Sequence, residues 1–327
     1  MKPSNIGGQA VMEGIMMRHK DKYSVGVRKP DHDIEVKVED YKSVFGTSPI
    51  LKKPLIRGAV SFVDSLVVGT KCLMYSAEVA GTEEDEEEKE KNAALSEEEK
   101  EKKKKKEDRM LKVVLTVTVI ISICLSIALF MLAPYAIASL LRKVGASEVV
   151  VTICEAIVKL ALFMGYMLLI SRMEDIQRVF MYHGAEHKCI NCVENGLPLT
   201  VENVMKSSRQ HRRCGTSFLF LVMLVSIFLH FIFVLVPSFK WRLFGRLLMV
   251  PVVAGISYEI IQWAGRTDNS CARFFSAPGL AMQKFTTKEP TPDMAEVAIK
   301  AVEAVFDWRS YLHEEFGLEF AAEEGKE

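Results

Sequence analysis

The segment TSFLFLVMLVSIFLHFIFVLV, residues 216–236, decides the fold of this chain. It contains no Asp, Glu, Lys or Arg, and its length matches the roughly 20 residues that a helix needs to cross about 30 Å of hydrocarbon. A single segment of this kind could still be a buried helix of a soluble protein. The interpretation as a membrane span therefore depends on whether the rest of the chain contains similar segments.

Three further apolar runs lie at Leu111–Leu132, Val149–Ile170 and Leu243–Ala264. The 327 residues are 49% hydrophobic and 26% charged, and the two kinds are separated into blocks. Four runs of this length with almost no interior charge argue against a soluble core. We expect an all-α polytopic membrane protein with about four transmembrane helices and a cytoplasmic α+β cap.

The composition divides the chain into four parts. These are an N-terminal cytoplasmic region (1–81), a charged low-complexity helix or linker (82–110), a four-helix membrane domain (111–264) with a cytoplasmic His/Cys loop (171–215), and a cytoplasmic tail (265–327). Alternation over Tyr23–Val38 predicts a β-hairpin. The apolar segment Pro54–Gly81 contains charges that argue against a plain fifth span, so we expect an interfacial, re-entrant or docked helical element. Apolar spacing over Thr291–Tyr311 predicts an amphipathic helix that packs on the cap.

Basic residues indicate the orientation. They are dense before the first span and in loop 171–215 and sparse in the other two loops, which predicts a multi-pass inner (plasma) membrane protein with both termini in the cytoplasm. The balance of 42 basic against 42 acidic residues gives no reason to expect nucleic acid. Lys102–Lys106 could bind anionic lipid, although a solvated spacer is the simpler interpretation of such a run. The sequence predicts the lipid bilayer as a partner and does not indicate a protein partner or a homo-oligomer.

The most informative polar stretch is YHGAEHKCINC, residues 182–192. Histidines four residues apart project from one face of a helix, so His183 and His187 can reach one metal ion. The order His-x-x-Glu-His is also a zinc-hydrolase signature. The stretch lies between two predicted spans, which suggests a metal site at a membrane surface.

Three interpretations of this stretch compete. In the first, His183 and His187 bind zinc or another divalent metal, Glu186 is the general base, and Glu259 is the third ligand. Glu259 lies about one turn inside the cytoplasmic end of the fourth span, where a carboxylate needs a partner. In the second, the histidines join Cys189 and Cys192 in a closed structural site, with Cys214 or Cys271 able to replace one ligand. In the third, the histidines form hydrogen bonds and bind nothing.

Other candidate residues are scattered through the chain. His211 and Cys214 precede the third span and are possible additional ligands, while Arg212 and Arg213 beside them could hold a phosphate or carboxylate. Glu13 lies in the glycine-rich stretch 7–14, whose backbone we expect to approach another group closely. Glu155, Lys159 and His230 fall inside predicted spans; they predict either an internal charge pair or an ion path.

Four motifs carry a family resemblance. They are GGQAVMEGIMMR (7–18), HGAEHK (183–188), RCGTSF (213–218) and APGL (277–280). The chain resembles the YqhQ-like bacterial membrane proteins, a domain-of-unknown-function family often labelled a predicted metal-dependent enzyme. The resemblance implies a metal but no substrate. It covers nearly the whole chain outside the charged insert.

These observations lead to three functional hypotheses. The first is a metal-dependent integral membrane enzyme, a hydrolase that acts at the cytoplasmic membrane surface. The second is a non-catalytic membrane-protein assembly factor with a structural metal. The third is a small transporter or channel that uses the polar residues inside the spans.

Overall fold

The computed structural model describes residues 2–81, 110, 113–114, 116–236, 238–267 and 269–320. The chain forms two compact units, Met1–Ala80 with Leu169–His230 and Ser238–Glu327, and Gly81–Leu168 with Phe231–Pro237. The charged segment 82–110, including Lys102–Lys106, lies outside the described residues apart from Met110, so its predicted roles remain predictions.

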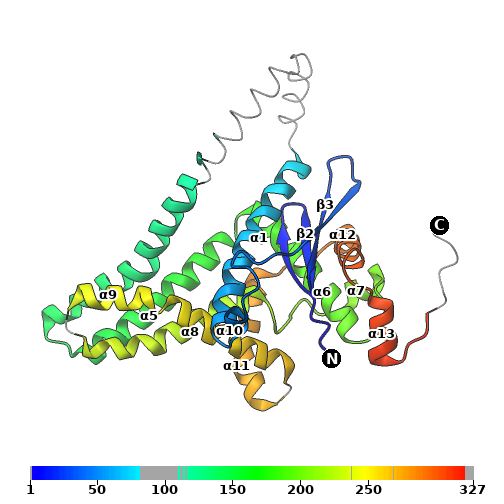
Figure 1. Ribbon diagram of the computed structural model, residues 1–327. Helices are drawn as coiled ribbons and strands as arrows, with labels where there is room; N and C mark the ends of the chain where they lie inside the picture. The colour runs from blue at the N-terminus through cyan, green and yellow to red at the C-terminus, as the bar shows by residue number, and fades with distance from the viewer. Residues whose placement is uncertain are drawn as a thin grey trace. The chain divides into compact units, whose positions relative to one another are not determined.

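A four-stranded antiparallel sheet opens the first unit (Figure 1). Its strands follow the chain in order: β1 (Gly7–Val11), β2 (Gly14–His19), β3 (Lys22–Arg28) and β4 (Ile34–Asp40). The predicted hairpin is confirmed, because β3 pairs with β4 from Lys22↔Asp40 to Arg28↔Ile34. Strands β1 and β2 were not predicted. They are joined at the pair Val11↔Gly14, and the turn residue Glu13 has a φ of 49°.

Helices cover both faces of this sheet, which explains why β3 is buried almost throughout. Met16, Val25 and Val27 form a core with Val68 and Cys72 of α1 (Ile56–Ala80). Alternate residues of β2, Ile15 and Met17, belong to a second core. That core includes Met294, Val297 and Ala301 of α12 (Pro292–Glu303) and the buried face of α6 (Glu174–Glu194).

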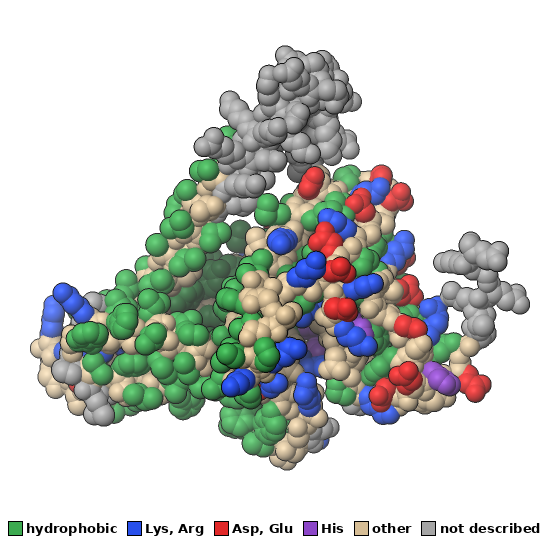
Figure 2. Space-filling view, viewed as in Figure 1, with side chains coloured by type: hydrophobic (Ala, Val, Ile, Leu, Met, Phe, Trp, Pro, Cys, Tyr) green, Lys and Arg blue, Asp and Glu red, His purple; other side chains and the backbone are tan. Residues whose placement is uncertain are grey.

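The C-terminal tail packs on the sheet and on α6, and it forms two helices rather than the single one predicted. α12 ends at Glu303, and α13 (Trp308–Phe316) begins after Asp307, whose side chain accepts a hydrogen bond from the Ser310 amide at 3.0 Å. An N-terminal cap of this kind satisfies a free amide of the new helix and marks the break. Charged side chains gather over the sheet and the C-terminal helices in Figure 2.

Among the described residues, four helices are long and apolar enough to cross a membrane: Ile56–Ala80, Thr116–Val144, Glu148–Ile170 (α5) and Gly215–Phe233, of which Gly215–His230 is α8. Three of them match predicted spans. The predicted fourth span is instead divided into α9 (Phe239–Leu248) and α10 (Val250–Arg266), at an angle of 40°. Pro251 lies in the first turn of α10 and has no backbone N–H, so it cannot donate a hydrogen bond to a carbonyl oxygen of α9.

The segment 54–81 forms one continuous helix, α1, rather than a re-entrant pair. It passes the length and hydropathy criteria for a span, yet its buried side runs along the sheet. The buried Asp64 carboxylate accepts hydrogen bonds from the Tyr41 hydroxyl at 2.8 Å and the Val44 amide at 2.9 Å. Helix α1 therefore packs on the sheet, and its predicted place relative to a membrane stays a prediction.

Candidate metal centre

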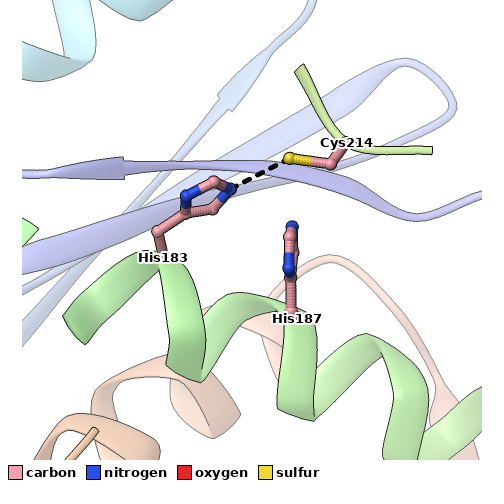
Figure 3. A group of neighbouring side chains, drawn as sticks. All are labelled: His183, His187 and Cys214. Carbon is pink, nitrogen blue, oxygen red and sulfur yellow. Dashed lines mark hydrogen bonds between the residues drawn. The ribbon is translucent and has the colours of Figure 1, made fainter. Parts of the chain in front are cut away.

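Helix α6 positions both histidines of the predicted motif. His183 and His187 project from one side of the helix, as their spacing predicts, and their ring centroids lie 4.4 Å apart (Figure 3). The helix starts with Glu174 and Asp175 in its first turn, where acidic side chains favour helix formation. Its second half is fully covered by the sheet, α12 and the following loop.

Cys214 completes a cluster with the two histidines. It lies directly before α8, and its Sγ is 3.1 Å from His183 Nε2. One ligand atom from each of the three side chains can be chosen so that all three atoms lie within 4.8 Å of one another. Figure 3 shows the two rings on α6 and Cys214 facing them from a different segment. Two imidazole nitrogens and a thiolate are a donor set that suits zinc.

Backbone carbonyls orient both imidazole rings. His183 Nδ1 lies 2.8 Å from the Thr286 carbonyl oxygen, and His187 Nδ1 lies 2.7 Å from that of Arg209. A carbonyl only accepts, so each Nδ1 carries the proton when the ring is neutral and each Nε2 keeps a free lone pair. His187 Nε2 is buried and makes no hydrogen bond within the described residues. An unsatisfied buried nitrogen beside a thiol fits a metal ligand.

Glu186 lies beside the cluster, held by the glycine-rich stretch at the start of the chain. The Gly8 amide of β1 donates a hydrogen bond to its carboxylate, while its Oε2 is buried without a partner among the described residues. A Cβ atom at Gly8 would lie 2.9 Å from the Glu186 Cδ and 2.8 Å from the Met16 carbonyl oxygen. The predicted close approach of this stretch is thus confirmed, and its target is the predicted base.

Burial and mutual attraction set the charges in the cluster. Burial raises the pKa of the Glu186 carboxyl, against the opposing effect of the two histidines. Burial also opposes ionisation of Cys214 and His183, but their attraction is stronger. It raises the pKa of His183 to about 9 and holds the pKa of Cys214 well below its usual value. The pair therefore favours a thiolate, the form in which cysteine binds metals.

Glu259 does not join this cluster, which corrects the prediction that it is the third ligand. Its carboxylate receives two hydrogen bonds from the Arg57 guanidinium, at 2.7 Å and 2.5 Å. Close packing of α1 on α10 brings Arg57 there. A Cβ on Gly58 would lie 2.6 Å from the Tyr258 side chain, and one on Gly255 would lie 2.4 Å from the Leu55 carbonyl oxygen. The carboxylate near the end of α10 does have a partner, but this is an arginine.

The closed site with Cys189 and Cys192 does not form either. Both thiols are buried in the apolar core on another side of α6, and burial raises the pKa of Cys189 well above its usual value. Cys192 Sγ donates to the Pro198 carbonyl oxygen at 3.4 Å. Cys214, one of the alternatives considered, takes the place that these cysteines were expected to fill, whereas Cys271 is exposed on α11 (Ser270–Thr286).

Side chains of α6 also fix the loop that carries Cys214. Lys188 Nζ donates to the carbonyl oxygens of Met205 and Ser207 at 2.7 Å and 3.0 Å. Asn191 Nδ2 donates to those of Ser208 and Gln210 at 2.6 Å and 2.9 Å. Sequence reasoning missed these residues. The only available signal was the placement of polar residues at helical spacing after His187, and this pattern does not reveal a partner.

The remaining candidates have other surroundings. Glu13 forms an ion pair with Arg178 of α6 and thereby fixes the β1–β2 turn. Glu155 is buried on α5 in the second unit, where Lys159 also lies, whereas His230 ends α8 in the first unit. The two units are not placed relative to one another, so the ion path stays a prediction.

Comparison with known proteins agrees with the resemblance seen in the motifs. A family model described as "Protein of unknown function (DUF1385)" matches residues 53–308. The chain belongs to this family. It is also 36% identical over 302 residues to the uncharacterized protein YqhQ of Bacillus subtilis (strain 168), a match that covers 91% of each chain. No solved structure matches. None of these descriptions names an activity.

Proposed function

We propose that this protein is a metal-dependent membrane enzyme, a hydrolase whose ion is bound by His183, His187 and Cys214. The observation that carries the proposal is the convergence of three ligand atoms within 4.8 Å, with both imidazole rings turned so that Nε2 faces the cluster. Three protein ligands leave one position of a tetrahedral site open, as catalytic zinc sites do. The thiolate favours zinc over magnesium or calcium.

Glu186 is the residue that we assign to proton transfer. When bound, the ion would act as a Lewis acid on a carbonyl or phosphoryl oxygen and would activate water. Glu186 Oε2 is buried without a partner among the described residues, so it can take the proton of the attacking water. The Gly8 amide donates a hydrogen bond to the same carboxylate and so holds it in place.

The apolar helices support a place in the cell inner (plasma) membrane, because their length and composition suit a bilayer. The distribution of basic residues supports cytoplasmic termini and a cytoplasmic metal centre. We therefore propose that the reaction takes place at the cytoplasmic surface of the membrane.

Substitution of Glu186 tests the catalytic role. We expect Glu186→Gln to retain the metal and to lower hydrolysis of a panel of carboxylic and phosphate esters by about 10²- to 10⁴-fold. The purified full chain in detergent would be assayed with its metal bound. Glu202→Gln is the matched control, because Glu202 is an exposed carboxylate on α7 (Val201–Lys206). Full activity of Glu186→Gln would remove Glu186 from the proposed role.

Enclosure of the cluster favours a second candidate, an assembly factor with a structural metal. The exposed fractions are 1% for His187 and 5% for both Glu186 and Cys214, so a substrate needs an opening to reach them. Structural zinc sites are typically closed in this way. Wild-type protein that holds its metal firmly but hydrolyses none of the panel would support this candidate over the hydrolase.

A further inference from the structure

We propose that Glu194 is a positioning residue that fixes Cys214 within reach of the ion, acting through Arg213. This inference rests on the proposed metal centre. Glu194 ends α6, the same helix that carries His183 and His187, but its carboxylate touches neither of them in any described contact. A single helix would thus hold two ligands directly and the third through an intermediate residue.

The contacts of Glu194 are unusually complete for a buried carboxylate. Its side chain is 2% exposed. Oε1 accepts hydrogen bonds from the amide and the hydroxyl of Ser4, both at 2.8 Å, and from Arg213 Nη2. Oε2 lies 3.4 Å from His211 Nε2. A buried charge with its acceptors satisfied stays ionised and rigid, so it is a firm anchor for the arginine.

Placement along α6 explains how the anchor reaches the cluster. Glu194 follows His183 by three helical turns, close to 11 residues, and so lies on nearly the same side of the helix, about 16 Å along its axis. Arg213 extends to Glu194 at this end, while the next residue, Cys214, turns its thiol to His183. The two consecutive side chains tie one short segment to α6 at two separated points.

The backbone at His211, just before Arg213, is held by contacts that do not involve Glu194. Glu194 therefore acts on a short segment whose start is already fixed. Gln283 of α11 is fully buried; its Oε1 accepts from the His211 amide at 2.9 Å and its Nε2 donates to the His211 carbonyl oxygen at 2.7 Å. Three residues, Arg212, Arg213 and Cys214, then remain before α8 begins at Gly215. Within this short segment the Arg213 side chain donates to Glu194, the Arg212 Nη1 donates to the Thr267 carbonyl oxygen at 3.5 Å, and the Thr216 amide donates to Cys214 Sγ at 3.4 Å. Of these three contacts, the one made by Arg213 ties the segment to α6.

Cobalt substitution tests the inference, because a thiolate bound to Co²⁺ gives a charge-transfer absorption that reports whether Cys214 is a ligand. The full-length protein in detergent would be titrated with Co²⁺. We expect wild type to show the thiolate band. Glu194→Gln leaves Arg213 without its charged partner, so we expect weaker Co²⁺ binding by about 10- to 100-fold, with loss of much of the thiolate band per bound ion. Glu202→Gln should behave as wild type.

The spectrum distinguishes positioning from a general loss of stability, because unfolding lowers the amount of bound ion but does not change the spectrum of the ion that remains bound. Arg213→Gln should reproduce the effect, and the double variant should be no worse than either single one. If Glu194→Gln fails to fold, the Co²⁺ affinity and the thiolate band of Arg213→Gln test the proposal instead. Wild-type affinity and spectrum in the folded variants would overturn the role of Glu194 alone. Absence of a thiolate band in wild type would instead overturn the metal centre itself.

Discussion

Cys214 is the residue whose role changes most between sequence and structure. Its thiol meets His183 at 3.1 Å, and the attraction between the two favours the thiolate. The same geometry without a metal would be a thiol–imidazole pair, in which Thr286 orients the base. Our proposal of a metal rests on His187, which brings a second nitrogen that has no other described partner.

Substitution of single cysteines separates these possibilities. We expect Cys214→Ser to reduce bound metal well below one ion per chain while the protein stays folded, because a hydroxyl is a poor zinc ligand. Cys271→Ser is the control, since Cys271 is a free and exposed thiol. Metal content by elemental analysis and helix content by circular dichroism would be measured together. Unchanged metal in Cys214→Ser would exclude Cys214 as a ligand.

Local spacing made the pairing of the two histidines predictable, whereas the third member of the cluster was not. The i, i+4 relation follows from helix geometry alone, so one segment is sufficient to place His183 beside His187. Choosing between Glu259 and Cys214 depends on how α1 packs against α10, because that packing supplies Arg57 to Glu259. Contacts between distant segments are not encoded in any local pattern.

At the scale of elements, α6 is the centre of the first unit. It contacts the sheet, α12 and α7, and its polar residues hold the loop that leads to Cys214. Close packing against the segment after α11 fixes its position, because a Cβ at Gly184 would lie 2.0 Å from the Lys288 carbonyl oxygen. Lys288 follows Thr286, which orients His183, by two residues.

Gly184→Ala tests the importance of this close packing. The added methyl group must push α6 away from the backbone at Lys288, so we expect a loss of about 1–3 kcal/mol of stability. Weaker metal binding should accompany it. Gly165→Ala on α5 is the control, because a Cβ there meets nothing within 4 Å. Thermal unfolding of the two variants would be compared in detergent. Equal midpoints of unfolding would show that the contact between α6 and Lys288 accommodates the added methyl group.

The β1–β2 hairpin shows why part of the sheet escaped prediction. Its turn contains Met12 and Glu13, neither of which is typical of a two-residue turn, and Glu13 adopts a φ of 49°. Contacts from Arg178 on α6 hold Glu13 in this conformation. The β3–β4 hairpin was predictable because its strands alternate around a Lys-Pro-Asp turn signal.

At the scale of the whole molecule, the apolar blocks of the sequence predicted where the main helices lie. They did not predict where a helix breaks or which helix packs on the sheet. Residues 243–264 lie in a broken helix pair because Pro251 interrupts them, and 54–81 form an apolar helix packed on the sheet. Hydropathy measures composition, so it does not tell a span from a helix that is buried along a cap.

Accessibility of cysteines tests the proposed orientation. We expect Val144→Cys to react in intact cells with a membrane-impermeant maleimide, because Val144 is 79% exposed at the end of the helix Thr116–Val144, just before α5. The native Cys271 should react only after the cells are opened, because we place it in the cytoplasm. Labelling of Cys271 in intact cells would reverse the proposed topology.

The metal content of the purified protein tests the central claim most directly. Wild-type protein, prepared without chelators and measured by elemental analysis, should contain about one zinc-like ion per chain, because three ligands converge within 4.8 Å. The double variant His183→Ala/His187→Ala should contain none, and Glu259→Ala should keep its ion. Wild-type protein with no bound metal, and with no uptake of added Zn²⁺ or Co²⁺, would contradict the account.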